Sequence, residues 1–137
     1  MNKPDYDSSA TFTSSNVGME AKVPYIAVIV GSSTNALASE SNPDKMNLVL
    51  ATVKRSIVEE KGKDNITKED WINRTASSRA LVEAGIVSDS QKARAMREGS
   101  LFEVSFKYTD RVIGQDANGA DIKAKKYDAK AINEEDL

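Results

Sequence analysis

The carboxylates are the first side chains to consider for chemistry, because the sequence contains no histidine and no cysteine. Without these two residue types the chain cannot form a Ser-His-Asp or Cys-His catalytic site, and structural zinc sites lose their usual ligands. The adjacent acidic pairs Glu59-Glu60 and Glu69-Asp70 would not face each other on a helix. We therefore expect no catalytic residues, no metal site and no cofactor.

Two glycine-containing stretches have the composition of ligand-binding loops. Val30-Gly31-Ser32-Ser33 follows an apolar segment, as phosphate-binding loops often do, but no P-loop or GxGxxG motif follows. We favour a simple strand-ending loop there. Residues 116–121 place Asp116, Asn118 and Asp121 around Gly119, but they lack the remaining ligands of a calcium-binding EF-hand. An Asn-Gly pair is also a strong hairpin signal, which is the interpretation we favour.

Basic residues in the second half of the chain form the third candidate site, for the phosphates of a nucleic acid. Two predicted helices, 67–84 and 88–98, precede a predicted hairpin at 110–127, which is the order of a winged helix. Glu83, Asp89 and Glu98 dilute this patch, and we favour a solvated helix face as its explanation. The candidate nucleic-acid-binding residues are Arg74, Arg79, Lys92, Arg94, Arg97, Lys123, Lys125 and Lys126.

Three helices are predicted to support these residues. Asn42-Pro43 has the residues of an N-cap and a first helical position, and Gly62 is a natural C-cap. Between them, apolar residues recur every three or four positions: Met46, Val49, Leu50, Val53 and Ile57. The second helix starts at a capping-box sequence, Thr67 to Asp70, and stops at Gly85, and the third spans 88–98.

Two segments have the pattern of strands. Residues 23–30 are apolar on both faces, which predicts a central, buried strand. Residues 101–109 alternate between apolar and polar, so Phe102, Val104, Phe106 and Tyr108 are expected to face the core. The sequence therefore predicts a single α+β domain, with a mostly antiparallel sheet and about three helices on one face.

The two ends of the chain differ from this domain. Residues 1–22 are polar and form a predicted N-terminal arm, in which Thr11 to Thr13 have the pattern of a short edge strand. The globular domain is expected over 23–132 and an acidic tail over 133–137. The start of the chain lacks the apolar core of a secretory signal, so we expect a cytoplasmic location, or host cytoplasm or virion for a viral protein.

The leading hypothesis from the sequence is a non-catalytic binding or assembly protein, such as a bacteriophage structural or accessory protein. It would act through the arm and an exposed sheet edge, on a protein partner or a second copy of itself, and not on a membrane. The alternative is a nucleic-acid-binding domain with the winged-helix layout. The net charge of −2 gives no overall basic field to support that alternative.

Overall fold

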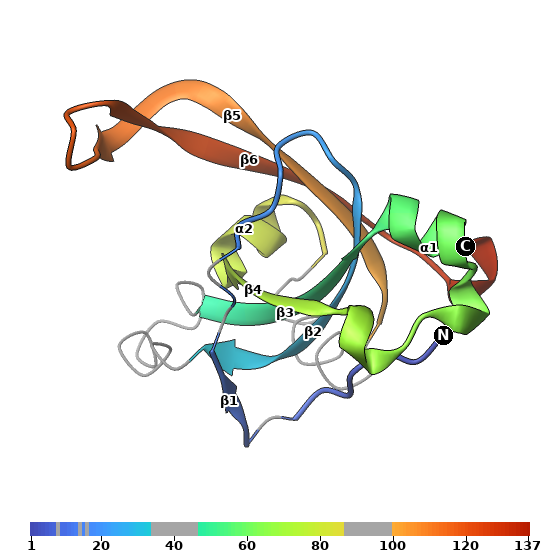
Figure 1. The fold of residues 1–137 in the computed structure, drawn as a ribbon. Helices are drawn as coiled ribbons and strands as arrows, with labels where there is room; N and C mark the ends of the chain where they lie inside the picture. The colour runs from blue at the N-terminus through green and yellow to red at the C-terminus, as the bar shows by residue number, and fades with distance from the viewer. Residues whose placement is uncertain (8, 14, 16, 34–46, 87–99) are drawn as a thin grey trace.

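A single sheet organises the protein in the computed structural model, which describes residues 1–7, 9–13, 15, 17–33, 47–86 and 100–137 (Figure 1). The strand order is β4-β3-β2-β5-β6, and β1 pairs with the end of β2. All pairings are antiparallel except β1 with β2. The strands are β1 (Thr11–Phe12), β2 (Tyr25–Ser33), β3 (Asn47–Lys54), β4 (Ile72–Ser77), β5 (Phe102–Gln115) and β6 (Asp121–Ala131).

The central strand β2 is buried on both faces, as its sequence predicts. Tyr25, Ala27 and Ile29 face one apolar cluster, while Ile26 and Val28 face the other. This arrangement follows from the alternation of side chains along a strand. The unbroken apolar run thus places β2 between two packed layers.

Helices cover both faces of the sheet, and here the prediction of about three helices on one face is wrong. The described residues contain two α-helices, α1 (Arg55–Lys61) and α2 (Ser78–Glu83). Val58 of α1 packs in the cluster containing Ile26, whereas Leu81 of α2 packs in the opposite cluster, with Tyr25. Among the described elements, no helix is both long enough and apolar enough to cross a membrane. The α+β class and the mostly antiparallel sheet are confirmed.

The predicted helix from Asn42 to Gly62 is wrong over most of its described length. Residues 47–54 form β3, and only α1 near the C-terminal end is helical. Leu48 to Val53 are buried without interruption, so β3, like β2, is covered on both faces. Three residues of the predicted helical stripe, Val49, Leu50 and Val53, belong to this continuous apolar run. Gly62 does terminate α1, with φ of 84° and its N–H donated to the Val58 carbonyl.

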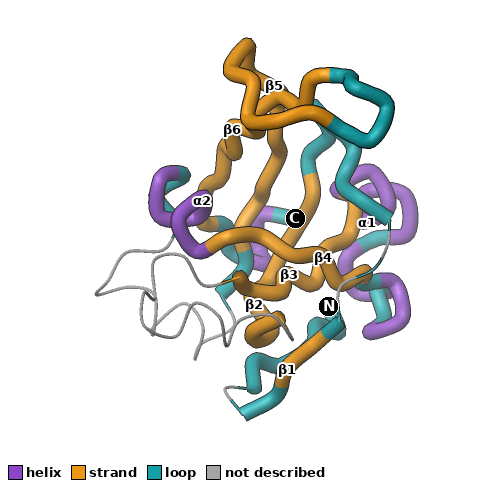
Figure 2. Tube along the Cα trace, turned by 90° about the vertical axis from the view of Figure 1, so that its left-hand side faces the viewer, coloured by secondary structure: helices purple, strands orange, loops and turns teal. Residues whose placement is uncertain are grey.

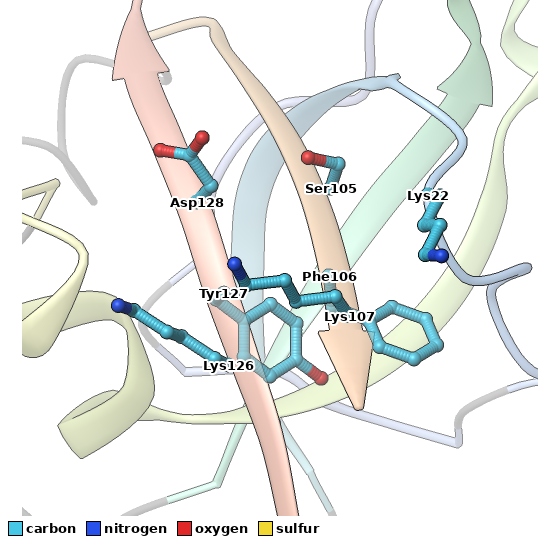
Figure 3. Close-up of a pocket in the computed structure, with 7 residues that line it drawn as sticks. All are labelled: Lys22, Ser105, Phe106, Lys107, Lys126, Tyr127 and Asp128. Atoms are coloured by element: carbon cyan, nitrogen blue, oxygen red, sulfur yellow. The ribbon is translucent and has the colours of Figure 1, made fainter. Parts of the chain in front are cut away.

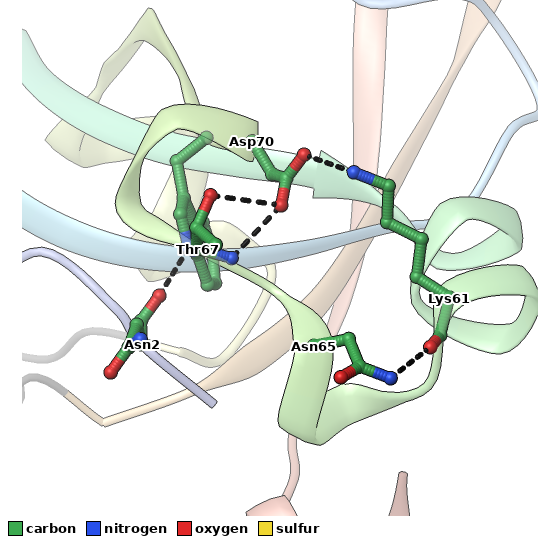
Figure 4. Close-up of polar contacts among 6 residues, drawn as sticks. Asn2, Lys61, Asn65, Thr67 and Asp70 are labelled. Atoms are coloured by element: carbon green, nitrogen blue, oxygen red, sulfur yellow. Dashed lines mark hydrogen bonds and ion pairs between the residues drawn. The ribbon is translucent and has the colours of Figure 1, made fainter.

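The predicted helix 67–84 is also wrong up to Ser77, because the α-helix begins only at Ser78. Residues Lys68–Asp70 form a 3-10 helix, η4, and the chain then enters β4 before α2 begins. The capping box is nonetheless present: the Asp70 carboxylate accepts the Thr67 N–H at 2.9 Å and binds Lys61 Nζ at 2.7 Å (Figure 4). The first helix of the winged-helix layout is therefore replaced by a strand, and residues 88–98 lie outside the described part.

The N-terminal segment lies against its own domain in the residues that the structure describes (Figure 2). Asp7 N–H donates to the Val30 carbonyl, and the Trp71 indole N–H donates to the Asn2 carbonyl at 2.8 Å. Phe12 in β1 packs so closely over Gly31 that a Cβ there would lie 2.5 Å from its ring. These contacts offset the conformational entropy that the segment loses when it becomes ordered, which its few apolar side chains alone could not offset.

The C-terminal residues also fold back. A short 3-10 helix, η5 (Glu134–Asp136), brings Glu134 Oε1 to 2.6 Å from the Met1 ammonium group. Lys63, in the 3-10 helix η3 (Lys63–Asn65), donates to the Glu134 carbonyl at 3.1 Å. The N- and C-terminal residues therefore lie together at one side of the molecule. The elements α1, η3 and η4 lie at the same side.

Candidate functional site

The β5–β6 hairpin extends beyond the rest of the sheet (Figure 1). β5 pairs with β2 only over Phe102 to Val104, whereas its pairing with β6 continues to Gln115 opposite Asp121. Lys22 N–H, in a left-handed turn with φ of 61°, donates to the Phe106 carbonyl. Beyond that point the hairpin still lies near α2, where Ala80 and Glu83 line an open hollow together with Thr109, Arg111 and Lys125. We call residues 107–126 the hairpin surface.

The tip of the hairpin is the Asn-Gly turn that the sequence predicts. Asp116 Oδ1 accepts the N–H groups of Asn118 at 2.8 Å and Ala120 at 3.0 Å. Gly119 has φ of 81°, a conformation that favours glycine. The Asp116 carboxylate thus stabilises the turn, which confirms the hairpin interpretation of residues 116–121.

Apolar side chains are unusually exposed on the hairpin surface. Tyr108 is 56% exposed, Val112 48%, Ile113 58% and Ile122 42%. They are four of the seven large hydrophobic residues that the described chain exposes, so this exposure is concentrated in one element. A concentration of exposed apolar groups is typical of an interaction site.

Basic side chains are interleaved with these apolar groups. The hairpin surface carries five basic and three acidic residues, although the whole chain has a net charge of −2. The basic residues are Lys107, Arg111, Lys123, Lys125 and Lys126. The hairpin surface is therefore positive and apolar at once.

Aromatic packing fixes the base of the hairpin. Phe106 is buried and meets Tyr108 edge to face, with ring centroids 5.4 Å apart, and it lies 5.9 Å from Tyr127. Lys125 Nζ lies 4.8 Å from the centre of the Phe106 ring, within the range of a cation–π contact. Tyr108 and Lys125 are therefore presented to solvent from an ordered support.

An open hollow of about 430 Å³ lies at this base, between Lys22, β5 and β6 (Figure 3). Three lysines, Lys22, Lys107 and Lys126, are among the residues that line it, together with Asp128. Burial, and then the neighbouring Tyr108, raises the pKa of Tyr127, so its hydroxyl stays protonated at neutral pH. The hollow offers positive charge to an anionic group, such as a carboxylate or a phosphate.

The predicted nucleic-acid-binding residues do not form one surface in the described part of the chain. Arg74 is only 7% exposed and donates from Nε to Thr52 Oγ1 at 2.8 Å. Arg79 is exposed on α2 and pairs with Glu83. Three others share β6: Lys123, Lys125 and Lys126. Lys92, Arg94 and Arg97 lie outside the described residues.

Sequence reasoning placed Tyr108 in the core, and that prediction is wrong. The period-two pattern correctly puts Tyr108 on the same face as Phe106. The pairing of β5 with β2 ends at Val104, however, and Tyr108 is exposed. The available signal was the cluster of lysines at 123–126, opposite the end of the apolar pattern. Such charges on both arms of a hairpin indicate that neither arm is covered.

Within the described residues, no three acidic side chains come together as a metal site would require. Comparison of the chain with family models, with curated proteins and with solved structures finds no match.

Proposed function

We propose that this protein is a non-catalytic binding or assembly protein whose binding element is the β5–β6 hairpin. The observation that carries the proposal is the concentration of exposed apolar and basic side chains on an element that projects from the body. Tyrosine and branched aliphatic residues supply contact area, and the lysines supply orientation and a preference for an acidic partner.

The lysines also limit how a partner can bind. Lys123, Lys125 and Lys126 follow the outer strand β6, whose far edge pairs with no other described strand. Lysines on edge strands oppose the addition of a similar strand, because like charges would meet across the new pair. The proposal is therefore contact through side chains on the hairpin surface.

The N-terminal segment has a structural role in this proposal. Its contacts with Val30, Trp71 and Gly31 cover parts of the core. Removing it would expose those residues and destabilise the domain. We therefore propose the hairpin, and not the N-terminal arm, as the binding element.

A nucleic acid is the second candidate partner, favoured by the three lysines among the residues that line the hollow and by the exposed ring of Tyr108. Amines contact phosphates, and aromatic rings stack on bases. A salt titration of oligonucleotide binding tests this candidate, since phosphate contacts require an affinity that falls steeply with salt. Absence of binding at about 50 mM salt would rule it out.

A photo-crosslinking amino acid tests the leading proposal. It is introduced in place of Ile113 at the hairpin or, as a matched control, in place of Thr75, an exposed residue of β4. Protein adducts formed in the native cell from position 113 and not from position 75 support the proposal. Equal adducts from both positions, or none from position 113, contradict it, and adducts to nucleic acid favour the second candidate.

A further inference from the structure

The end of the molecule opposite the hairpin tip carries an excess of negative charge (Figure 1). We call residues 55–70 and 133–137 the acidic end. They contain eight acidic and four basic side chains. The acidic residues are Glu59, Glu60, Asp64, Glu69, Asp70, Glu134, Glu135 and Asp136.

Local contacts hold these segments together. Lys61 Nζ binds Asp70 at 2.7 Å, which ties α1 to η4, and Lys63 Nζ binds the Glu134 carbonyl at 3.1 Å, which ties η3 to η5. An apolar residue, Ile72, follows η4 and is 39% exposed. The acidic end is thus a folded surface with an excess of negative charge, and Ile72 lies just outside it in the chain.

We propose that the hairpin surface of one copy docks on the acidic end of a second copy of this chain. This inference rests on the proposed function and names its partner. The two surfaces complement each other in charge, because the hairpin has two more basic than acidic residues and the acidic end has four more acidic than basic ones. The hairpin also offers the exposed apolar side chains of Ile113 and Ile122 for contact.

The positions of the two surfaces determine the form of the assembly. They lie at opposite ends of one molecule, so the hairpin surface of one copy cannot contact the acidic end of the same copy (Figure 1). A symmetric contact of two hairpins would bring like charges together at Lys123, Lys125 and Lys126. The favoured contact is therefore head to tail, which produces a ring or an open chain of copies.

A charge swap tests the inference directly. The hairpin variant carries Lys123→Glu and Lys126→Glu, and the end variant carries Glu60→Lys and Glu135→Lys. All four residues are exposed, and the fluorescence of Trp71, the one tryptophan, checks that each variant is folded. Glu20→Lys, in the segment before β2, is the control reversal outside both surfaces.

Sedimentation velocity measures the result over a range of protein concentrations. The wild type and the Glu20→Lys control should associate at about 50 mM salt and dissociate at about 0.5 M salt. Each swap variant alone should associate roughly tenfold or more weakly. An equimolar mixture of the two variants should recover association, because each acidic hairpin then meets a basic end.

Three results would overturn the inference: a wild type that stays monomeric at low salt, swap variants that associate like the wild type, or a mixture that does not recover. A monomeric chain whose position 113 still crosslinks to a different protein would refute self-assembly and leave the proposed function standing. Absence of any hairpin-specific protein adduct would refute the proposed function itself.

Discussion

Replacing Arg74 with methionine tests whether this arginine belongs to the core. Its guanidinium group donates to Thr52 Oγ1 at 2.8 Å and to the Val17 carbonyl at 2.9 Å. It also lies 5.1 Å from the centre of the Tyr25 ring. Arg74 therefore links β4, β3, β2 and the N-terminal segment, and none of its contacts faces a nucleic acid.

The size of the expected loss of stability depends on which of these contacts water can replace. The buried bond to Thr52 contributes about 1.5 kcal/mol or more, as a bond from a charged donor, and the contact with Tyr25 about 1 kcal/mol. Val17 is exposed, so water replaces its lost donor at little cost. Methionine keeps much of the aliphatic packing and avoids burying a charge, which offsets part of the loss. We expect Arg74→Met to lower the free energy of unfolding by about 2 kcal/mol.

Urea unfolding followed by Trp71 fluorescence measures this loss, since Trp71 is buried in the core. Arg79→Met is the matched control, because Arg79 is exposed and its pair with Glu83 contributes about 0.5 kcal/mol or less. The Arg74 variant should unfold at a midpoint about 1 M lower in urea. Equal midpoints for the two variants, or loss of oligonucleotide binding in Arg74→Met without loss of stability, would refute the reasoning.

Three further predictions test other parts of the structure. Gly31→Ala should lower the free energy of unfolding by about 1–3 kcal/mol, because its methyl group would collide with the Phe12 ring, and Phe12→Leu in the same chain should restore part of it. The bond from Lys61, and then that from the Thr67 N–H, lower the pKa of Asp70. Its charge therefore stabilises the fold above its ordinary pKa of 3.8, and this is lost as the pH falls below that value. Asp70→Asn should flatten the acid side of a plot of urea midpoint against pH, and an unchanged slope would contradict this. Burial raises the pKa of Tyr127, so stability should fall as the pH rises above 10.0. Burial also raises the pKa of Tyr6, so an absorbance titration should show late-ionising tyrosines, and Tyr127→Phe should remove one of them. A titration that Tyr127→Phe leaves unchanged at high pH would count against this.

The elements that sequence reasoning predicted correctly have signals that do not depend on distant contacts. The apolar run of β2 requires cover on both faces, and Asn118-Gly119 requires a tight turn wherever the hairpin lies. The capping box of Thr67 and Asp70 is equally local, and it forms even though a long helix does not follow. Each of these is set by the backbone preferences of a few adjacent residues.

The helices were overpredicted because a buried strand and a helix can share one apolar pattern. Val49, Leu50 and Val53 fit a helical stripe, but Leu48 and Ala51, which lie off that stripe, are equally buried. β-branched residues and cover on both faces favour a strand in such a run. The deciding factor is that β2 and β4 lie on either side of β3, a tertiary contact that periodicity does not contain.

The candidate site was predictable in its charges but not in its extent. The lysines of β6 and the turn could be named from the sequence, yet Tyr108 was assigned to the core. Apolar and polar side chains alternate along β5 in the same way before and after the point where β2 stops pairing with it. Burial there depends on the length of the neighbouring strand, so the pattern within β5 could not locate the boundary.

The same boundary divides the hairpin into two parts of different stability. Below it, the burial of Phe106, the bond from the Lys22 N–H to the Phe106 carbonyl and the packing of Tyr127 against the core anchor the strands to the domain. Above it, Val112 and Ile113 gain little from folding, because a two-stranded ribbon without cover is only marginally stable. Free energy that is not gained within the chain is available for contact with another molecule. A partner surface that is acidic and partly apolar would therefore stabilise the tip of the hairpin more than any other part of this protein.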